Sequence, residues 1–583
     1  VNNVASSGQD YFHYYSIKQI TEFLATTSCA TEITLLNNPP VITASPDYTI
    51  PKGTAFVLTG NATDSDVADV LTYTWEQIDD GVVTSSTFGP DNPSGANFRS
   101  QLPSIDPSRY FPKMSRVLQG SLTQTNPTIN TAWETVSNVE REMNFALSVR
   151  DNNSEGGQVA SDILKIDVVN SAGPFVVLSQ NTNVSYVGGS IQEVSWDVAN
   201  TNNAIVNAEK VDILLSTDGG ATFPYLVADD VPNDGAQNIL IPGEVTSQAR
   251  VMVKASDNVF FAVNSTNFSI SSSLVVLNFS ALEYTVCQPS DLVVPFVYET
   301  NSGFSETSTF SISGMPAGLT ASFSQLTANS DNTAVAITFS NTNVVAVGEY
   351  PITVTSSSAS VTKQVAINLN INSTTFSTVN LSAPSDNLVD AGINPTFQWD
   401  VEASSSSYDI QIATDLAFTN IVEAATVLFN SYTSIGLLPN TTYYWHVKPK
   451  NSCGEGVYSS SYSFTTTSVD CTIKTAPSLP IAISSSGTPT IFSTITFAED
   501  LPIADVNVIL NVTHTYLADL TIKLTSPQGT SVILVSNSCG DTRNINATFD
   551  SSAASFVCGN NPAITGVVKP LGSLNSFIGE SSQ

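Results

Sequence analysis

Clusters of aspartate and asparagine are the residues of this sequence whose types and spacing best fit a chemical role. Asp64, Asp66 and Asp69 come just before the alternating segment LTYTW, and Asp151 and Asn153 follow a second alternating segment, FALSV. If the two segments are antiparallel neighbours, their ends bring these side chains together. Hard cations such as Ca²⁺ need several carboxylate and carbonyl oxygens at one place. Asp and Asn also form turns without binding an ion, so a structural calcium site and a plain turn remain open alternatives.

Histidine, the usual general base of hydrolytic enzymes, is scarce in this chain. It occurs three times, as His13, His446 and His514, and neither an H-E-x-x-H motif nor a G-x-S-x-G elbow is present. His446 lies inside an alternating segment and is interpreted as an ordinary strand residue. His13 has no acidic or histidine partner at ligand spacing. We therefore assign no catalytic residue to this chain.

The six cysteines indicate local disulfides and an oxidising compartment. Two pairs are close in sequence, namely Cys453 with Cys471 and Cys539 with Cys558. For Cys29 and Cys287 three alternatives stay open: a bond to each other, free thiols, or partners outside this chain. Zinc is the rival interpretation of the cysteines, but no CxxC motif occurs, which disfavours a structural zinc site.

The charge balance excludes several classes of function. Asp and Glu number 51 against 19 Lys and Arg, so the formal charge is −32, while 12% of the residues are charged and 41% are hydrophobic. A nucleic-acid binder needs a basic surface, and an anionic membrane repels so acidic a chain. No run of about 18 apolar residues occurs, so no membrane-spanning segment is predicted. The composition favours secreted or cell-surface β-modules.

One segment has helical periodicity, and the rest is predicted to fold as strands. Between residues 11 and 27, Ile17, Ile20 and Phe23 recur at helical spacing, and Ser16 with Gln19 has the form of a capping box. After Asn38, short alternating segments separated by Gly, Pro, Asn and Asp predict stacked sandwiches of about 100 residues each. The expected fold class is therefore all-β, built of tandem β-sandwich modules with one N-terminal helix.

The turn-forming stretches divide the chain into six parts. They are a helical leader at 1–37, an Ig- or cadherin-like module at 38–172 with a long insertion at about 84–137, Ig-like modules at 173–270 and 271–375, a fourth module at 376–468, and a last module at 469–583.

Two of these modules resemble known β-module families. In the fourth, Leu437, Pro439 and Tyr443 match fibronectin type III, in which a tyrosine ties its hydroxyl to the backbone of the preceding corner, and Trp399 fits the core tryptophan of an early strand. In the first, a D-x-D before a Y-x-W strand resembles bacterial cadherin-like and polycystic-kidney-disease-like domains. These likenesses indicate fold and leave function open.

The last module resembles the P-domain, a jelly-roll module that follows the catalytic domain in kexin-like proprotein convertases and many secreted bacterial peptidases. The matching positions are Asp505, His514-Thr515-Tyr516, Asp519-Leu520, and Ser526-Pro527 with Gly529-Thr530. The resemblance implies that Asp541, Asn546 and Asp550 bind structural calcium, and that His514 and Asp519 are structural. The family pattern continues after Gly579 with two further strands, so this module is expected to be truncated.

The order of all these parts resembles secreted bacterial reprolysin-like zinc metallopeptidases. In that family a Y-F-H segment, here Tyr11-Phe12-His13, precedes the last helix of the peptidase domain and a cysteine, and an N-P-P-x-I module with an R-Y-F-P segment, here Arg109 to Pro112, follows. The resemblance implies a non-catalytic C-terminal region, with Zn²⁺ held only by a missing catalytic domain. It also implies a protein substrate or cell-surface partner, export by the type IX secretion machinery, and a lost disulfide partner for Cys29.

Two other classes of function remain as alternatives. A cell-surface adhesin or filament component also consists of sandwiches in series, although the modules here differ visibly in pattern and are not near-identical repeats. The accessory region of a carbohydrate-active enzyme also strings Ig-like and fibronectin modules together, but the P-domain-like segment disfavours it.

Overall fold

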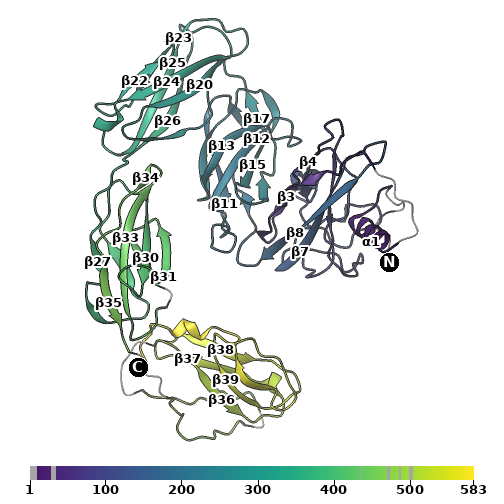
Figure 1. Cartoon of the computed structure of the whole chain (residues 1–583), viewed down its shortest axis with the longest axis vertical. Helices are drawn as coiled ribbons and strands as arrows, with labels where there is room; N and C mark the ends of the chain where they lie inside the picture. The colour runs from purple at the N-terminus through teal and green to yellow at the C-terminus, as the bar shows by residue number, and fades with distance from the viewer. Residues whose placement is uncertain are drawn as a thin grey trace. The chain divides into compact units, whose positions relative to one another are not determined.

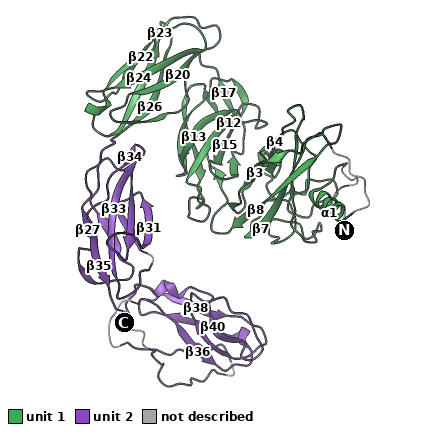
Figure 2. Ribbon diagram, in the orientation of Figure 1, with its two compact units in different colours: residues 1–372 green, residues 373–583 purple. Residues whose placement is uncertain are grey.

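A computed structural model describes residues 5, 10–27, 35–434, 436–468, 473–484, 487–497 and 503–582. Almost all regular structure in these ranges is strand, arranged as sandwiches in series, which confirms the predicted all-β class. The chain forms two compact units, residues 1–372 and 373–583 (Figures 1 and 2). None of the helices in the described ranges has the length and apolar content needed to cross a bilayer.

The leader contains helix α1, Tyr14–Ala25. The N-terminal end of this helix is bonded to the first module. A carboxylate oxygen of Glu76 accepts a hydrogen bond from the backbone N–H of Tyr14 at 2.8 Å, and the other contacts the His13 ring. The helix begins after His13, so the capping box expected at Ser16 and Gln19 is wrong, because Ser16 already lies inside the first turn. No side chain of α1 is buried, and the apolar Phe23 is 68% exposed.

The first module is built around a four-stranded sheet in the order β2-β8-β7-β5. Its elements are β1 (Val41–Ile42), β2 (Tyr48–Pro51), β3 (Ala55–Thr59), β4 (Ala62–Thr63), β5 (Thr72–Gln77), β6 (Ser108–Phe111), α2 (Met114–Leu118), β7 (Arg141–Arg150) and β8 (Val159–Val169). Strand β8 alternates between buried apolar and more exposed residues from Leu164 to Val168, as expected for a strand with one face on a core, whereas β7 is buried at every residue from Phe145 to Val149.

The insertion at 84–137 contains a buried ion pair and is bonded to strand β5 of the first module. Arg109 of β6 and Glu134 lie with 3.3 Å between guanidinium nitrogen and carboxylate oxygen, and their side chains are 8% and 0% exposed. Arg109 also donates to the carbonyl oxygens of Trp75 and Arg99. Burial lowers the pKa of Arg109, while the carboxylate of Glu134 opposes that shift. A buried charge needs such a partner, so this pair joins two parts of the insertion, and the bond from Arg109 to Trp75 ties the insertion to β5.

The first and second modules share one sheet and one core. The second module contains β9 (Val176–Val177), β10 (Ser185–Val187), β11 (Ile191–Asp197), β12 (Lys210–Ser216), β13 (Tyr225–Pro232), β14 (Ala236–Leu240), β15 (Thr246–Ala255), β16 (Phe260–Val263) and β17 (Phe268–Ser271). Strand β16 pairs with β3, with Phe260 opposite Phe56, so the sheet runs β10-β17-β15-β16-β3-β6. One apolar cluster extends from Ile50 to Ile270, so the boundary expected at 172/173 does not separate two cores.

The third module is a two-sheet sandwich. Its elements are β18 (Val275–Phe279), β19 (Glu283–Cys287), β20 (Leu292–Thr300), β21 (Ser308–Ser313), β22 (Thr320–Phe323), β23 (Thr327–Ala328), β24 (Thr333–Ser340), the 3₁₀ turn η1 (Thr342–Val344), β25 (Gly348–Ser357) and β26 (Thr362–Asn372). The sheets run β18-β20-β24-β22 and β19-β26-β25-β21-β23. Its core also contains Leu240 of the second module, so the two modules pack together.

The fourth module has the tyrosine corner that its sequence predicts. It contains β27 (Leu381–Ala383), β28 (Leu388–Ala391), β29 (Thr396–Trp399), β30 (Ser407–Ala413), β31 (Ile421–Val427), β32 (Ser431–Thr433), β33 (Thr442–Asn451), β34 (Gly454–Glu455) and β35 (Tyr462–Thr466). The hydroxyl oxygen of Tyr443, a side chain that is 1% exposed, accepts a hydrogen bond from the Leu438 N–H at 2.9 Å. Trp399 is buried in the same core.

The last module has two small sheets, β36-β39-β40 and β37-β38. Its elements are β36 (Val508–Val512), η2 (Leu517–Asp519), β37 (Thr521–Thr525), β38 (Ser531–Ser536), β39 (Ile545–Phe549), β40 (Ile564–Val568) and η3 (Leu574–Phe577). The predicted disulfide between Cys539 and Cys558 is present. Cys453 and Cys287 are each disulfide-bonded, while Cys471, the predicted partner of Cys453, and Cys29 lie outside the described residues.

The Tyr443 hydroxyl should stabilise the fourth module by about 1 kcal/mol, the usual net value of a buried hydrogen bond. We expect Tyr443→Phe to lower the melting temperature of this module by several degrees in calorimetry of the full chain, roughly 4–8 °C per kcal/mol for a domain of this size. Tyr444→Phe is the matched control, because the Tyr444 hydroxyl makes no hydrogen bond with any described residue. Equal melting temperatures for the two variants would contradict the assigned role.

Candidate metal centre

The register of two neighbouring strands brings the predicted acidic residues of the first module together. Strands β5 and β7 are antiparallel, and Thr72 at the start of β5 faces Arg150 at the end of β7. Asp69, just before β5, and Asp151, just after β7, therefore lie at the same end of this strand pair. Asp64 lies in the turn that follows β4, at the same end of the module.

Three carboxylates meet at this point. One oxygen from each of Asp64, Asp69 and Asp151 lies within 4.8 Å of the other two, and no other such group of acidic, histidine or cysteine side chains occurs among the described residues. Asp151 is 1% exposed, and the other two are partly buried. Carboxylates this close repel one another unless a cation or a proton neutralises them. An all-oxygen set is what Ca²⁺ prefers in proteins.

The backbone and neighbouring amides hold the central carboxylate in place. Asp151 accepts hydrogen bonds from the N–H of Gln158 at 2.8 and 3.0 Å and from the Asn37 side-chain amide at 2.6 Å. One oxygen of Asp64 accepts from the Asp66 N–H at 2.8 Å. Its other oxygen is shielded from solvent and has no hydrogen-bond partner among the described residues, so it remains available to a cation.

The other two residues predicted for this site lie beside the carboxylates and serve them indirectly. Asp66 turns toward Asn38, accepting from its backbone N–H at 2.7 Å and its side-chain amide at 3.1 Å. Asn153 donates its amide to both oxygens of Asp69 at 3.1 Å. The Asn153 side chain therefore donates hydrogen bonds to the Asp69 carboxylate and contributes no oxygen ligand to the cluster.

The sequence reasoning missed Asn37, which connects the leader to this cluster. Its amide nitrogen donates to Asp151, and its side-chain oxygen accepts from Asn153 at 3.0 Å. The available signal was the pair Asn37-Asn38 ahead of two prolines, which we used only to mark where the first module begins. The contact spans more than 110 residues, so spacing alone does not reveal it.

The three residues proposed for calcium in the last module lie on strand β39 or in the loops beside it. Asp541 lies in the loop before strand β39, and Asp550 follows the strand directly. One oxygen of Asp550 accepts from the N–H and hydroxyl of Ser552, both at 2.7 Å, and these bonds lower the pKa of Asp550. Asn546 is an exposed residue inside β39. The calcium assignment of these three residues therefore stays a prediction.

Two of the histidines make local contacts that indicate structural roles. His514 bonds through its ring to the backbone of Tyr516 and through its N–H to the Asn544 side chain at 3.1 Å, joining two loops beside η2, which ends at Asp519. His13 has an acidic partner after all, Glu76, which lies 63 residues away in sequence. Only the fold brings that pair together.

The third histidine is held between two aromatic rings. His446 of β33 stacks on Phe418 at a centroid distance of 3.5 Å and on Tyr458 at 3.8 Å, and its ring is 3.0 Å from the side-chain oxygen of Gln411. Burial, helped by the nearby Lys448 charge, lowers the pKa of His446 to about 4. The imidazole is therefore neutral at physiological pH and serves as a packed strand residue.

The comparisons with known proteins bear mainly on the last module. Residues 503–559 match the family model of the proprotein convertase P-domain. These residues span β36 to β39 and include His514, Asp519 and the Cys539–Cys558 disulfide. No curated protein matches the chain.

Several solved structures of β-modules align with parts of the chain. The chicken CNTN1 FN1-FN3 domains align at 14% identity over 51% of this chain and 98% of theirs, with a TM-score of 0.23. Titin domains A168-A170 align at 12% identity over 49% and 96%, with a TM-score of 0.22. An Fn3-like protein from Clostridium thermocellum aligns at 20% identity over 16% and 96%, with a TM-score of 0.14. With scores this low, these likenesses carry no argument about function.

The low pKa of His446 predicts a pH dependence of stability. The folded state holds the imidazole neutral down to about pH 4, whereas the unfolded chain takes up a proton near pH 6.5. The contribution of His446 is therefore fully present above pH 6.5 and declines as the pH falls toward 4. NMR titration of the imidazole should give a midpoint near 4, and His446→Gln should flatten the stability profile in this window. A midpoint near 6.5 would contradict the assignment.

The carboxylate cluster predicts calcium-dependent stability of the first module. Ca²⁺ at about one hundred times its Kd should add about 2.7 kcal/mol, seen as a higher melting temperature that a chelator reverses. Asp64→Asn should remove most of this gain, because the unpartnered oxygen is lost as a charged ligand. Asp91→Asn, an exposed acid in the same module, is the control. A melting temperature unaffected by calcium and chelator would rule the site out.

Proposed function

We propose that this chain is the non-catalytic, multi-module C-terminal region of a secreted zinc metalloendopeptidase. The observation that carries the proposal is the match of residues 503–559 to the proprotein convertase P-domain, a module whose family partners are peptidases. The ordered series of sandwiches before it is consistent with a region that spaces, orients or recruits a protein substrate while hydrolysis takes place in a catalytic domain.

The residues described here do not fit a catalytic zinc site. Zinc peptidases use histidine together with a carboxylate, but the three histidines belong to different modules and are engaged with Glu76, Gln411 and the backbone of Tyr516. The acidic cluster in the first module is an oxygen-only set. In this proposal, zinc chemistry belongs to a separate peptidase domain, and the first module holds a structural Ca²⁺.

Helix α1 supports a connection to such a domain. Its first residues are tied to β5 through Glu76, while none of its side chains is buried and the apolar Ile20, Phe23 and Leu24 are 45%, 68% and 56% exposed. An amphipathic helix gains stability by covering its apolar face. We propose that the peptidase domain covers it, with the Glu76 contacts fixing the helix against the first module.

The proposed location is the outside of the cell or its surface. Disulfides at Cys539–Cys558 and at Cys287 and Cys453 fit an oxidising compartment. Export would use the type IX secretion machinery, and the partner would be a protein substrate or a cell-surface component. The acidic surface, with a formal charge of −32, gives no reason to expect nucleic acid as a partner.

The reading frame of the source gene tests this proposal most directly. It should encode an H-E-x-x-H zinc motif in the same open reading frame, ahead of the residues described here. The purified chain alone should not cleave casein with or without added Zn²⁺, whereas the full-length product should. A reading frame without a zinc motif, or caseinolysis by the chain alone that survives repurification, would refute the proposal.

A further inference from the structure

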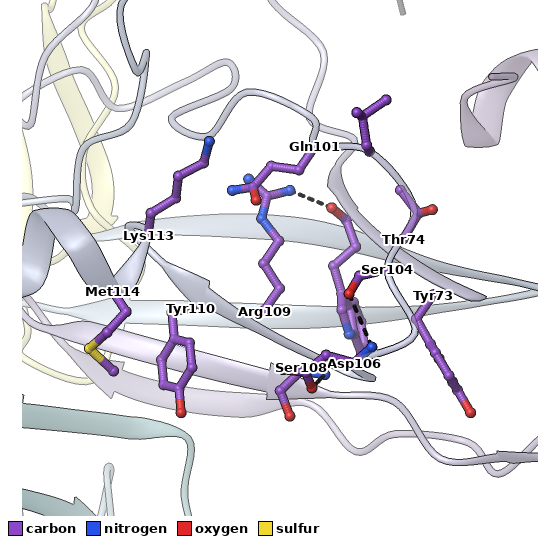
Figure 3. A pocket seen from close by; sticks show the side chains of 12 residues that line it. Tyr73, Thr74, Gln101, Ser104, Asp106, Ser108, Arg109, Tyr110, Lys113 and Met114 are labelled. Carbon is purple, nitrogen blue, oxygen red and sulfur yellow. Dashed lines mark hydrogen bonds between the residues drawn. The ribbon is translucent and has the colours of Figure 1, made fainter. Parts of the chain in front are cut away.

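A pocket with both polar and apolar walls lies where the insertion meets the open side of the first sandwich. It encloses about 190 Å³ between edge strands β5 and β6, and its lining includes Thr74, Gln101, Asp106, Arg109 and Lys113 (Figure 3). Pockets for drug-sized molecules have roughly 300–1,000 Å³, so this one suits a single small group. No residue of the proposed calcium site lines it.

The chain segment around the pocket has the opposite charge to the rest of the protein. Residues 99–116 carry four cations, Arg99, Arg109, Lys113 and Arg116, against one acid, Asp106, while the whole chain has a formal charge of −32. A local excess of positive charge on so acidic a protein attracts anions.

The buried guanidinium in the pocket wall is not fully satisfied. Arg109 is 8% exposed, and its terminal nitrogens donate to Trp75, Arg99 and Glu134, but its Nε is buried without a hydrogen-bond partner among the described residues. An unpaired donor on a buried cation is costly. Its charge nevertheless acts at short range on a group in the pocket, because Arg109 lines the pocket wall.

The Glu134 carboxylate behind Arg109 already accepts three hydrogen bonds. Glu134 accepts from Arg109 at 3.3 Å, from the Gln101 amide at 3.0 Å and from the backbone N–H of Lys113 at 2.9 Å. The ammonium group of Lys113 is exposed and makes no ion pair with any described residue. Figure 3 shows the Lys113 and Gln101 side chains reaching toward the same end of the pocket as the Arg109 guanidinium. This end therefore holds two cations beside Glu134, while Glu76, the other buried carboxylate that acts on Arg109, is engaged with His13 and Tyr14.

The other end of the pocket is acidic and hydroxyl-lined. Asp106 accepts from the N–H of Ser108 at 2.9 Å, and its own N–H donates to the Ser104 hydroxyl at 3.0 Å. These bonds hold the Asp106 carboxylate at the serine end. An anion is therefore favoured only at the Lys113 end.

We propose that this pocket binds a carboxylate group presented by a protein, either an acidic side chain or a chain terminus, with Lys113 and Arg109 as the binding cations. A carboxylate at this end gains a charge-assisted hydrogen bond from the exposed Lys113 ammonium group and attraction from the Arg109 guanidinium. The inference stands on the geometry of the insertion and holds whether or not the chain belongs to a peptidase.

Matched small probes test the proposal on the full 583-residue chain. N-acetylglycine presents a chain-terminal carboxylate, N-acetylaspartate α-amide presents an acidic side chain, and N-acetylglycinamide lacks the charge. We expect saturation-transfer NMR and calorimetry to detect binding of one or both acids, weakened by salt, and none of the amide. Tighter binding of either acid identifies the source of the carboxylate.

Variants at the exposed cation keep the test independent of folding. Lys113→Gln should weaken binding about tenfold, the loss expected for one charge-assisted hydrogen bond, without changing the melting temperature. Lys165→Gln, which removes a lysine paired with Asp167 in the same module, should leave binding unchanged. Equal binding of acids and amide, no binding of either acid, or an unaffected Lys113→Gln variant would overturn the proposal.

Discussion

The antiparallel pairing of β5 with β7 is the constraint on which the functional features of the first module depend. Thr72 opposite Arg150 sets the register, and this register places Asp69 and Asp151 at one edge of the sheet. Farther along the same strand, Glu76 holds the start of helix α1. A register shift of one residue would turn every side chain of β5 to the other face. One ladder of backbone hydrogen bonds thus positions both the carboxylate cluster and the leader.

Strand β3 connects the first two modules. Its residues belong to the first module in sequence, but the strand is part of the second module's sheet. Its contact with β16 places Phe56 against Phe260, and on its other side it pairs with β6, which carries Arg109. The insertion therefore rests on a sheet that crosses the boundary between two modules. Movement of the second module relative to the first would break backbone hydrogen bonds as well as apolar contacts, so we infer that the two act as one body.

The sequence was most informative where a feature is local or follows strand alternation. The tyrosine corner at Tyr443 and the disulfide between Cys539 and Cys558 depend on short separations, and both are present. The grouping of Asp64, Asp69 and Asp151 was reachable because each flanks a recognisable strand.

Features that depend on distant partners were not predictable from one sequence. Glu76 meets His13 across 63 residues and Glu134 meets Arg109 across 25, and neither spacing distinguishes these acids from others in the chain. Strand β3 is buried along nearly its whole length, so its alternation could not show which sheets it joins.

Crystallography with anomalous scattering at the carboxylate cluster tests the central claim most directly. Crystals of the full chain grown with Ca²⁺ should show one anomalous peak between Asp64, Asp69 and Asp151, with metal–oxygen distances of about 2.3–2.6 Å. The peak should be absent from Asp64→Asn crystals grown in the same way. A well-ordered cluster holding only water at saturating calcium would contradict the account.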